Sequence, residues 1–245
     1  MSSESPLAFA RARFRASCGD CGLRAACLPA GLRRSEIVEF DRIVVRGRRF
    51  DAGTSLYAAG DRVSNLYVLR SGTVKCCRTE SGGAECVTGF LLEGDVVGLE
   101  EVAEERHRGS ARALEAVEAC VIVAGRLHAL SERLPGLETQ LPRVVSRRVA
   151  AQRRALSLTR GASVTDAVLA LLRLLIDRAD GALDPRPVPL TLRLPQADVA
   201  SFLGVEPAVL REACRRLALQ RSLVPSDSHV ELRGPARLLA RARRS

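Results

Sequence analysis

The feature that most restricts the fold of this chain is a group of three cysteines close to its N-terminus. Cys18, Cys21 and Cys27 follow the spacing C-x2-C-x5-C, and a C-x2-C pair lets two sulfurs bind one metal centre without straining the backbone. Tetrahedral metal sites and iron–sulfur clusters usually take four ligands, so this motif lacks one. The fourth must come from elsewhere in the fold, and the candidates are Cys76, Cys77, Cys86, Cys120 and Cys214.

Cysteines also serve as small buried hydrophobic residues, and we favour this interpretation for Cys76, Cys77, Cys86 and Cys214. It does not suit the three N-terminal cysteines, because the charged segment 1–17 is predicted to be disordered and offers no core. That segment also lacks the apolar stretch of a secretory signal, so we expect a cytoplasmic protein. Thiols stay reduced in the cytoplasm, which favours metal or cluster binding over a disulfide framework.

The net charge is concentrated in the C-terminal part of the chain. Residues 1–140 carry 19 basic and 19 acidic side chains, whereas residues 141–245 carry 19 basic and 9 acidic ones, so the whole +10 lies in the second segment. A basic region joined to a neutral one favours contact with a polyanion. Hydrophobic residues make up 47 % of the chain, which indicates a globular protein, and no apolar run reaches the roughly 18 residues of a membrane span.

Residues 43–126 have the pattern of an all-β domain. Short apolar runs alternate with turns such as Gly60-Asp61 and Ser71-Gly72, and a short helix is expected before them at 34–41. Closely spaced strands with turn signals between them predict a sandwich or a roll. The predicted strands are 43–45, 55–57, 65–69, 73–77, 85–92, 95–99 and 114–123.

The period of the apolar residues changes after Pro135. Five residues that step by three or four positions predict one face of a long helix: Leu141, Val145, Val149, Gln152 and Leu156. We expect this face to pack against the same helix of a second copy, which would make the protein a homodimer. Packing within the chain is the alternative.

The C-terminal part has the pattern of a winged helix-turn-helix. Gly204 suits a tight turn between two helices, and Ala200 is small enough for the point where they cross. The predicted elements are a helix that begins after Ser163, a loop at 180–189, helices at 195–203 and 206–219 whose first turns hold Pro195 and Pro207, and a wing formed by 223–224 and 230–232.

A β-roll, a long helix and a winged helix-turn-helix, in this order, resemble the CRP/FNR family of bacterial transcription regulators. Residues 53–74 read G-x2-L-Y-x2-G-D-x4-L-Y-x-L-x-S-G-x-V, which is similar to the family's β-roll pattern. The resemblance covers about residues 17–233. It implies an α+β fold with an N-terminal antiparallel β-roll of the jelly-roll, cyclic-nucleotide-binding type, a long dimerisation helix and a C-terminal winged helix-turn-helix. The expected divisions are 1–30 for the N-terminus and cysteine loop, 31–134 for the β-roll sensor domain, 135–160 for the dimerisation helix and 161–245 for the DNA-binding domain.

Within this family the chain resembles the FNR branch, named for fumarate and nitrate reduction. That branch carries C-x2-C-x5-C near its N-terminus and a fourth cysteine in an A-L-E-x4-C segment, and here Ala113-Leu114-Glu115 precedes Cys120. The resemblance implies that Cys18, Cys21, Cys27 and Cys120 ligate an oxygen-labile 4Fe–4S cluster. It also implies double-stranded DNA and RNA polymerase as partners.

The chain departs from the sequence patterns of this family at three places. The cyclic-nucleotide branch binds ribose and phosphate with a Glu and an Arg, which are Leu99 and Gly109 here, so no cyclic nucleotide is expected. Gln152 replaces an Asp that keeps the cluster-free form of the FNR branch monomeric. The family's base-reading Glu and Arg correspond to Ala208 and Glu212. We therefore expect a different DNA half-site, read by residues of the second helix of the motif: Pro207, Ala208, Arg211, Glu212, Arg215 and Arg216.

The sequence thus predicts a homodimeric, cytoplasmic, DNA-binding transcription regulator that senses oxygen or nitric oxide through a 4Fe–4S cluster and controls anaerobic or redox-responsive genes. The alternative is a zinc- or thiol-based redox regulator of the same fold, since four thiolates also hold zinc. A second alternative is a regulator that works through protein contacts rather than DNA. We do not expect an enzyme, because His107, His128 and His229 are isolated from one another and no phosphate loop or nucleophile motif is visible.

Overall fold

The computed structural model describes residues 17–157, 163–182, 191–219, 223–224 and 226–233. The chain divides into two compact units. One consists of the residues up to Cys76 together with Phe90–Arg147, and the other of Cys77–Gly89 together with the residues from Arg148 onward. The predictions made for residues 1–16 and 183–190, and for the side chain of Leu156, lie outside the described part of the chain.

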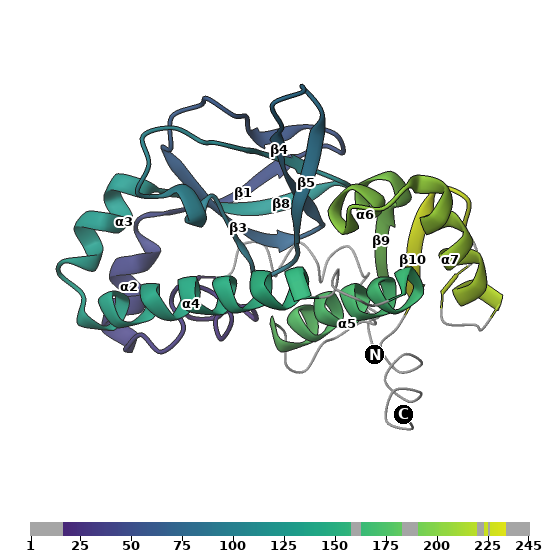
Figure 1. The fold of residues 1–245 in the computed structure, drawn as a ribbon. Helices are drawn as coiled ribbons and strands as arrows, with labels where there is room; N and C mark the ends of the chain where they lie inside the picture. Colours follow the sequence, from purple (N-terminus) through teal and green to yellow (C-terminus); the bar gives the residue numbers. More distant parts are fainter. Residues whose placement is uncertain (1–16, 158–162, 183–190, 220–222, 225, 234–245) are drawn as a thin grey trace, which may run out of the picture. The chain divides into compact units, whose positions relative to one another are not determined.

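Residues 44–123 form the predicted β-roll (Figure 1). Its strand pairs β1–β8, β2–β7, β3–β6 and β3–β8 are antiparallel. One four-stranded sheet has the order β1-β8-β3-β6 and the other the order β2-β7-β4-β5. The α+β class with an antiparallel roll is therefore confirmed. The strands are β1 (Val44–Phe50), β2 (Ser55–Tyr57), β3 (Asn65–Ser71), β4 (Val74–Thr79), β5 (Glu85–Leu91), β6 (Val96–Val97), β7 (Ser110–Ala113) and β8 (Val117–Val123), with a 3₁₀ turn η1 at Leu99–Glu101.

Two elements of this region differ from the prediction. The predicted strand 114–123 begins only at Val117, because the backbone N–H of Leu114 and the carboxylate of Glu115 are both held by Thr73. Ser110–Ala113 forms a strand of its own, β7. The helix α3 (Ala124–Ser131) was not predicted, since its eight residues are too short to show a clear helical period.

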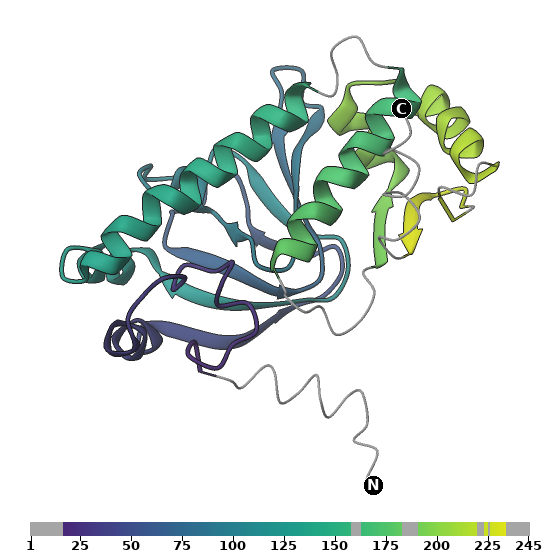
Figure 2. The ribbon, with the colours of Figure 1, turned by 90° about the horizontal axis from the view of Figure 1, so that it is seen from below.

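The cysteine loop of residues 17–33 packs on the first sheet and on the predicted helix α2 (Arg34–Asp41). Leu28 and Phe40 are fully buried in one apolar cluster with residues of the sheet and with Leu137. Figure 2 shows the loop, in the darkest purple, curling back beside α2. Apolar burial therefore fixes this loop to the roll, which the sequence alone did not indicate.

The long predicted helix is α4 (Pro135–Ser157), and its first turn is bound to the start of α2. The buried carboxylate of Glu36 accepts the backbone N–H of Arg33 at 2.8 Å and that of Gly136 at 3.1 Å. Both N–H groups belong to helix starts, where backbone donors lack intrahelical partners. One side chain thus joins the end of the cysteine loop to the beginning of α4.

The second unit contains the predicted helix-turn-helix. Its elements are α5 (Val164–Ala182), β9 (Thr191–Pro195), α6 (Gln196–Leu203), α7 (Pro207–Leu219) and β10 (His229–Arg233). Gly204 ends α6 in the left-handed conformation with φ of 64°, as the turn requires. No helix in the described ranges is both long and apolar enough to cross a membrane.

Pro195 is both the last residue of strand β9 and the N-cap of α6, so the predicted helix begins one residue later, at Gln196. The main partner of β10 is β9, through five residue pairs from His229↔Pro195 to Arg233↔Thr191. The predicted wing pairing is limited to a single bridge between Val224 and Glu231. Strand β9 was missed because it directly follows a proline-rich loop, which reads as irregular.

We predict that Gly136→Ala destabilises the protein by about 1–3 kcal/mol, as overpacked cores do. The added Cβ would lie 2.8 Å from both a carboxylate oxygen of Glu36 and a methyl group of Leu32. Gly125→Ala, in α3, is the matched control, because nothing lies within 4 Å of its added Cβ. It should stabilise by up to about 1 kcal/mol through helix propensity. Urea unfolding of the purified parent and of both variants measures the change in the free energy of unfolding. Equal stability of the two variants would contradict the close contact at Gly136.

Candidate functional site

The structure brings together the four cysteines that the sequence indicated as ligands. Cys18, Cys21, Cys27 and Cys120 line one cavity, although about 90 residues separate Cys120 from the other three. The remaining wall is mostly apolar and is formed by Leu23, Pro29, Phe40, Val44, Val68 and Ile122, with the side chains of Arg24 and Arg70. Cys77 and Cys214 are buried elsewhere, as expected of small hydrophobic residues.

Successive turns of the cysteine loop bring its three thiols to one place. The backbone N–H groups of Asp20, Arg24 and Cys27 donate to the carbonyls of Ser17, Cys21 and Leu23, respectively. The chain therefore curls between Cys18 and Cys27 instead of extending. At the start of the loop, the N–H of Cys18 donates to the Asp41 carboxylate at 2.7 Å, which ties the loop to the end of α2.

Cys120 lies on β8 between two strands that each contain a β-bulge. On β1, Val45 pairs with Val121 and Arg48 with Ala119, so Arg46 and Gly47 together face Cys120. Gly47 has φ of 77°, the left-handed conformation that such a bulge uses. On β3, Leu69 pairs with Ala119 and Ser71 with Glu118, which leaves Arg70 as the extra residue. Bulges re-aim side chains, and here each one supplies an arginine.

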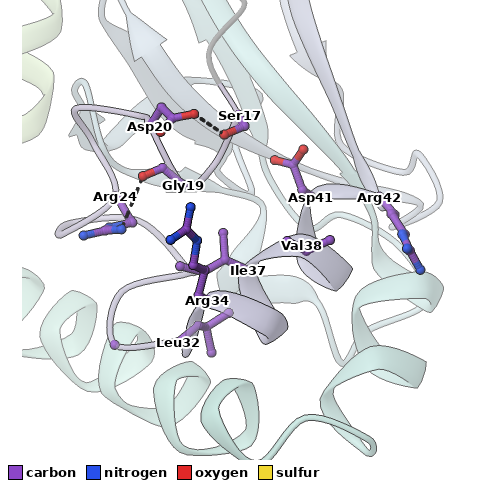
Figure 3. Close-up of a pocket in the computed structure, with 11 residues that line it drawn as sticks. Ser17, Gly19, Asp20, Arg24, Leu32, Arg34, Ile37, Val38, Asp41 and Arg42 are labelled. Atoms are coloured by element: carbon purple, nitrogen blue, oxygen red, sulfur yellow. Dashed lines mark hydrogen bonds between the residues drawn. The ribbon is translucent and has the colours of Figure 1, made fainter.

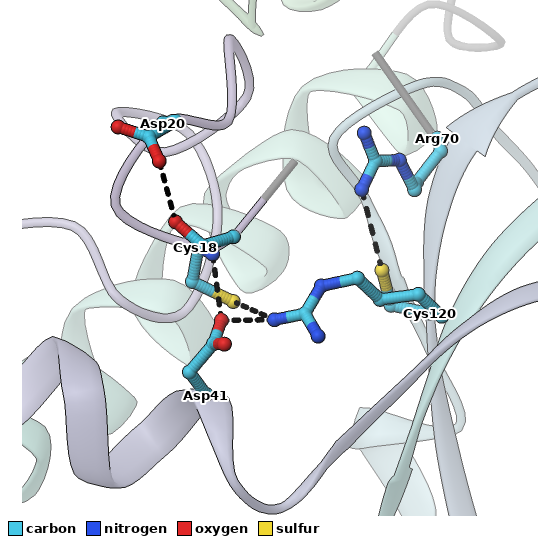
Figure 4. A network of polar contacts seen from close by, with 7 residues as sticks. Cys18, Asp20, Asp41, Arg70 and Cys120 are labelled. Carbon is cyan, nitrogen blue, oxygen red and sulfur yellow. Dashed lines mark hydrogen bonds and ion pairs between the residues drawn. The ribbon is translucent and has the colours of Figure 1, made fainter. Parts of the chain in front are cut away.

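Each of these two arginines donates to the sulfur of a different cysteine segment (Figure 4). Arg70 Nη1 lies 3.9 Å from Cys120 Sγ, and Arg46 Nη2 lies 3.7 Å from Cys18 Sγ. Arg46 also pairs with Asp41, the residue that accepts the Cys18 N–H.

Sequence reasoning missed Arg46, Arg70 and Asp41. The signal that could have found them is a glycine or an arginine inside an apolar strand pattern, which indicates a bulge or a buried charge.

Burial favours the protonated thiols of Cys18, Cys27 and Cys120 by raising the pKa of each. Loss of water raises the pKa of Cys18 to about 12, an effect that Asp41 reinforces and Arg46 opposes. Burial likewise raises the pKa of Cys27, to which the neighbouring cysteines add, and the pKa of Cys120, against which Arg70 acts. Binding of a metal or a cluster must therefore release protons from these thiols.

The donor set fits an anionic, thiolate-ligated group. Four soft thiols converge on one cavity, and two guanidinium groups point at two of the sulfurs. Within the described ranges, no three His, Cys, Asp or Glu side chains lie close enough together to hold a single metal ion.

A second pocket, open to solvent, lies between the cysteine loop and α2 (Figure 3). Arg24 lines both this pocket and the cysteine cavity, and Gly19, Asp20 and Ile37 line the open one. The cysteine loop is therefore the wall between solvent and the four thiols.

Side chains close in sequence to Leu99 and Gly109, the positions of the family's nucleotide-binding Glu and Arg, make contacts within the roll. The rings of Tyr57 and His107 stack with centroids 3.6 Å apart, and Nδ1 of His107 lies 2.7 Å from the Glu101 carboxylate. Ser110 Oγ accepts the backbone N–H of Ala59 at 2.9 Å. Leu99 is buried at the position of the family's ribose-binding Glu.

The predicted DNA-reading residues lie on α7 and are all exposed: Pro207, Ala208, Arg211, Glu212, Arg215 and Arg216. Glu212 pairs with Arg216 at 3.0 Å and with Arg215 at 3.7 Å. Arg211 lies one residue before Glu212 on the same helix, and no ion pair of its guanidinium is found among the described residues.

The predicted dimerisation face of α4 is partly exposed. Val145 and Val149, one turn apart, have exposed fractions of 42 % and 40 %, and Gln152 is exposed as well. Leu141 is half-buried and packs on the core of its own chain. The C-terminal part of the face therefore offers apolar area that this chain does not cover in the described structure.

Comparison with known proteins identifies the class. Residues 47–133 match the family described as cyclic nucleotide-binding domain. The chain is 32 % identical over 190 residues to the transcriptional regulatory protein Btr of Bordetella pertussis, and the aligned region covers 78 % of each protein. It is 31 % identical over 189 residues to the fumarate and nitrate reduction regulatory protein of Yersinia pestis, which covers 77 % of this chain and 75 % of the relative. FixK2 from Bradyrhizobium japonicum superposes with a TM-score of 0.63 at 19 % identity, over 80 % of this chain and 97 % of that one, and so shares the fold.

Together with the roll and the helix-turn-helix, these matches define a DNA-binding transcription regulator and not an enzyme. The chain belongs to the CRP/FNR family, and within it to the FNR branch.

Proposed function

We propose that this regulator senses oxygen or nitric oxide through a 4Fe–4S cluster ligated by Cys18, Cys21, Cys27 and Cys120, and that it controls anaerobic or redox-responsive genes. The observation that carries the proposal is the shared cavity: four cysteines chosen from spacing and resemblance line one enclosed, mostly apolar space. The relative from Yersinia pestis is a fumarate and nitrate reduction regulatory protein, which supports control of anaerobic genes by this chain as well.

The relatives favour a cluster over the zinc alternative, because the chain belongs to the branch that includes the fumarate and nitrate reduction regulatory proteins. Four thiolates also suit tetrahedral zinc, so metal analysis separates the two. The open pocket on the outer side of the loop supports access by a small gas molecule to the thiol site.

A bound cluster supplies a covalent tie between the cysteine loop and β8 and a centre that reacts with oxidants. Contacts within the chain connect the cysteine loop to the start of α4. The loop shares its apolar cluster with Leu134 and Leu137, and Glu36 holds the first turn of α4. We therefore infer that loss of the tie alters the start of the dimerisation helix, and with it the spacing of the two recognition helices.

The other partners follow from the same proposal. A homodimer through α4, double-stranded DNA and RNA polymerase are the expected partners, in the cytoplasm. Cyclic nucleotide is not expected, because Gly109 offers no charge to a phosphate and Leu99 offers no carboxylate to a ribose. Regulation through protein contacts alone is the remaining alternative, and it predicts no salt-dependent binding to random DNA.

We predict that anaerobically purified protein is brown, with about four iron and four sulfide per chain, and that it bleaches in air. Cys120→Ser should abolish the colour, because it removes the ligand from β8. Cys214→Ser is the matched control and should keep it, since Cys214 is buried in α7, outside the cysteine cavity. Iron and sulfide assays and a visible spectrum measure the result. Colourless anaerobic protein with one bound zinc would refute the proposal.

We predict that the cluster-free protein is a dimer at micromolar concentration, because Gln152 supplies no like-charge repulsion. Two carboxylates at this position would oppose association by at most a few kcal/mol, about the energy of two charges 4–6 Å apart near a surface. Gln152→Asp should therefore dissociate the dimer, whereas Ser146→Asp, exposed on another face of α4, should not. Sedimentation of air-exposed protein decides; a monomeric parent, or a dimeric Gln152→Asp, would contradict the prediction.

We predict weak binding to the TTGAT-type half-site of the family and preference for a different sequence, because Ala208 and Glu212 replace the family's base-reading pair. Arg211→Ala should cost about 1–3 kcal/mol and relax the sequence preference if Arg211 reads a base, and should weaken all sequences alike if it contacts phosphate. Arg126→Ala, an equal charge loss on exposed α3, should leave DNA affinity unchanged. Selection from a random duplex library with anaerobic protein is the test, and enrichment of the TTGAT palindrome would show the prediction wrong.

A further inference from the structure

Two arginines flank the four-cysteine cavity. Arg46 and Arg70 each lie within hydrogen-bond reach of a cavity sulfur, and both come from β-bulges beside Cys120. Two bulges on the two strands that neighbour one residue are a costly local departure from regular pairing. Bulges occur next to functional sites because they turn particular side chains towards a ligand.

The surroundings of Arg70 are mostly apolar. It is 7 % exposed and lines the cavity together with Phe40, Val44, Val68 and Ile122. Arg46 reaches Cys18 from outside this lining, and its side chain is 22 % exposed. In apolar surroundings a charge acts more strongly on a neighbouring group than it does in water.

Two carboxylates contact the arginines near the cavity. Asp41 pairs with Arg46, and Glu118, on β8, pairs with Arg49 at 3.7 Å and interacts with Arg70. The Nε of Arg46 is buried and has no hydrogen-bond partner in the described part of the chain. This buried donor and the two contacts between arginine and sulfur favour an anionic group between the four thiols.

We propose that Arg46 and Arg70 are positioning residues for the group that the four cysteines hold, and that their charges set its reduction potential. This inference rests on the proposed function. Four thiolates bring more negative charge than an iron–sulfur core brings positive charge, so the bound group is anionic. Arg46 acts on the loop side, through Cys18, and Arg70 acts on the sheet side, through Cys120.

The test compares three variants on anaerobically loaded full-length protein: Arg46→Gln, Arg46→Lys and the control Arg48→Gln. Arg48 lies two residues further on the same strand, but it is exposed and its guanidinium packs over Phe50. The measurements are the midpoint potential of the cluster, from a dithionite titration with mediator dyes, and the half-time of iron loss to a chelator. Circular dichroism of the cluster-free variants checks that each one folds.

Removal of a nearby positive charge disfavours the more negative, reduced state. Arg46→Gln should therefore raise the ratio of oxidised to reduced cluster about tenfold at a fixed potential. For a one-electron couple this corresponds to a midpoint potential lower by about 59 mV. It should also shorten the half-time of iron loss several-fold. Arg46→Lys, which keeps the charge, should stay close to the parent, and Arg48→Gln should match it. Arg70→Gln should shift the potential in the same direction as Arg46→Gln.

The outcomes separate this inference from the function on which it rests. A parent protein that holds no cluster would overturn both. A parent that holds a cluster, with Arg46→Gln equal to Arg48→Gln in potential and iron loss, would overturn the role of Arg46 alone. If Arg46→Gln folds but cannot be loaded while Arg46→Lys can, the charge is required and the inference stands. If both Arg46 variants fail alike, the role is one of shape and the inference is wrong.

Discussion

The apolar packing of the cysteine loop on the β-roll is the interaction on which the candidate site depends. Leu28 from the loop and Phe40 from α2 are fully buried against the sheet, and each contributes roughly 1.5–3 kcal/mol by leaving water. The polar ties of the loop, such as the Cys18–Asp41 hydrogen bond, are each worth about 1 kcal/mol. Apolar contacts therefore keep the loop on the roll whatever the state of its thiols. Under the proposed function, loss of the cluster would change the shape of the loop without releasing it, and the signal would be a small rearrangement that close contacts transmit.

In these apolar surroundings, the charged residues at the site indicate a ligand. In an otherwise regular roll, β1 and β3 both break register beside Cys120, and each break turns an arginine towards sulfur. Local rules of strand pairing and burial are violated here twice within a few residues. Natural proteins show such violations mainly where a ligand or a reaction compensates them. The thiols alone would suit many buried cysteines, but thiols with aimed guanidinium groups indicate a site for a negatively charged group.

The sequence predicted the order of elements well, because it depends on local spacing. The four cysteines chosen from spacing and resemblance line one cavity, and their role as ligands stays a prediction. The helix at 34–41 matches α2, and the turn glycine Gly204 lies where the helix-turn-helix needs it. The sequence did not predict β9, α3 or the positions of Arg46 and Arg70. These depend on pairing partners that are distant along the chain, and the period of a short segment carries no information about its partner. The choice of Cys120 among five candidates also came from resemblance and not from spacing, since only the register of β8 against β1 and β3 brings it to the loop.

The contact between Glu36 and Gly136 is the one described path from the cysteine loop to the dimerisation helix that is both polar and buried. The hydrogen bond from the Arg33 N–H, together with that from Gly136, lowers the pKa of the Glu36 carboxyl, although burial opposes this. A carboxyl whose pKa is lowered in the folded state contributes stability that is present above its ordinary pKa and is lost only as the pH falls through the lowered value. Near neutral pH the carboxylate therefore stays charged and keeps both helix starts together. The path to α4 then responds to the conformation of the loop and not to ordinary changes in cellular pH, which suits a regulator whose signal is the chemical state of its cysteines.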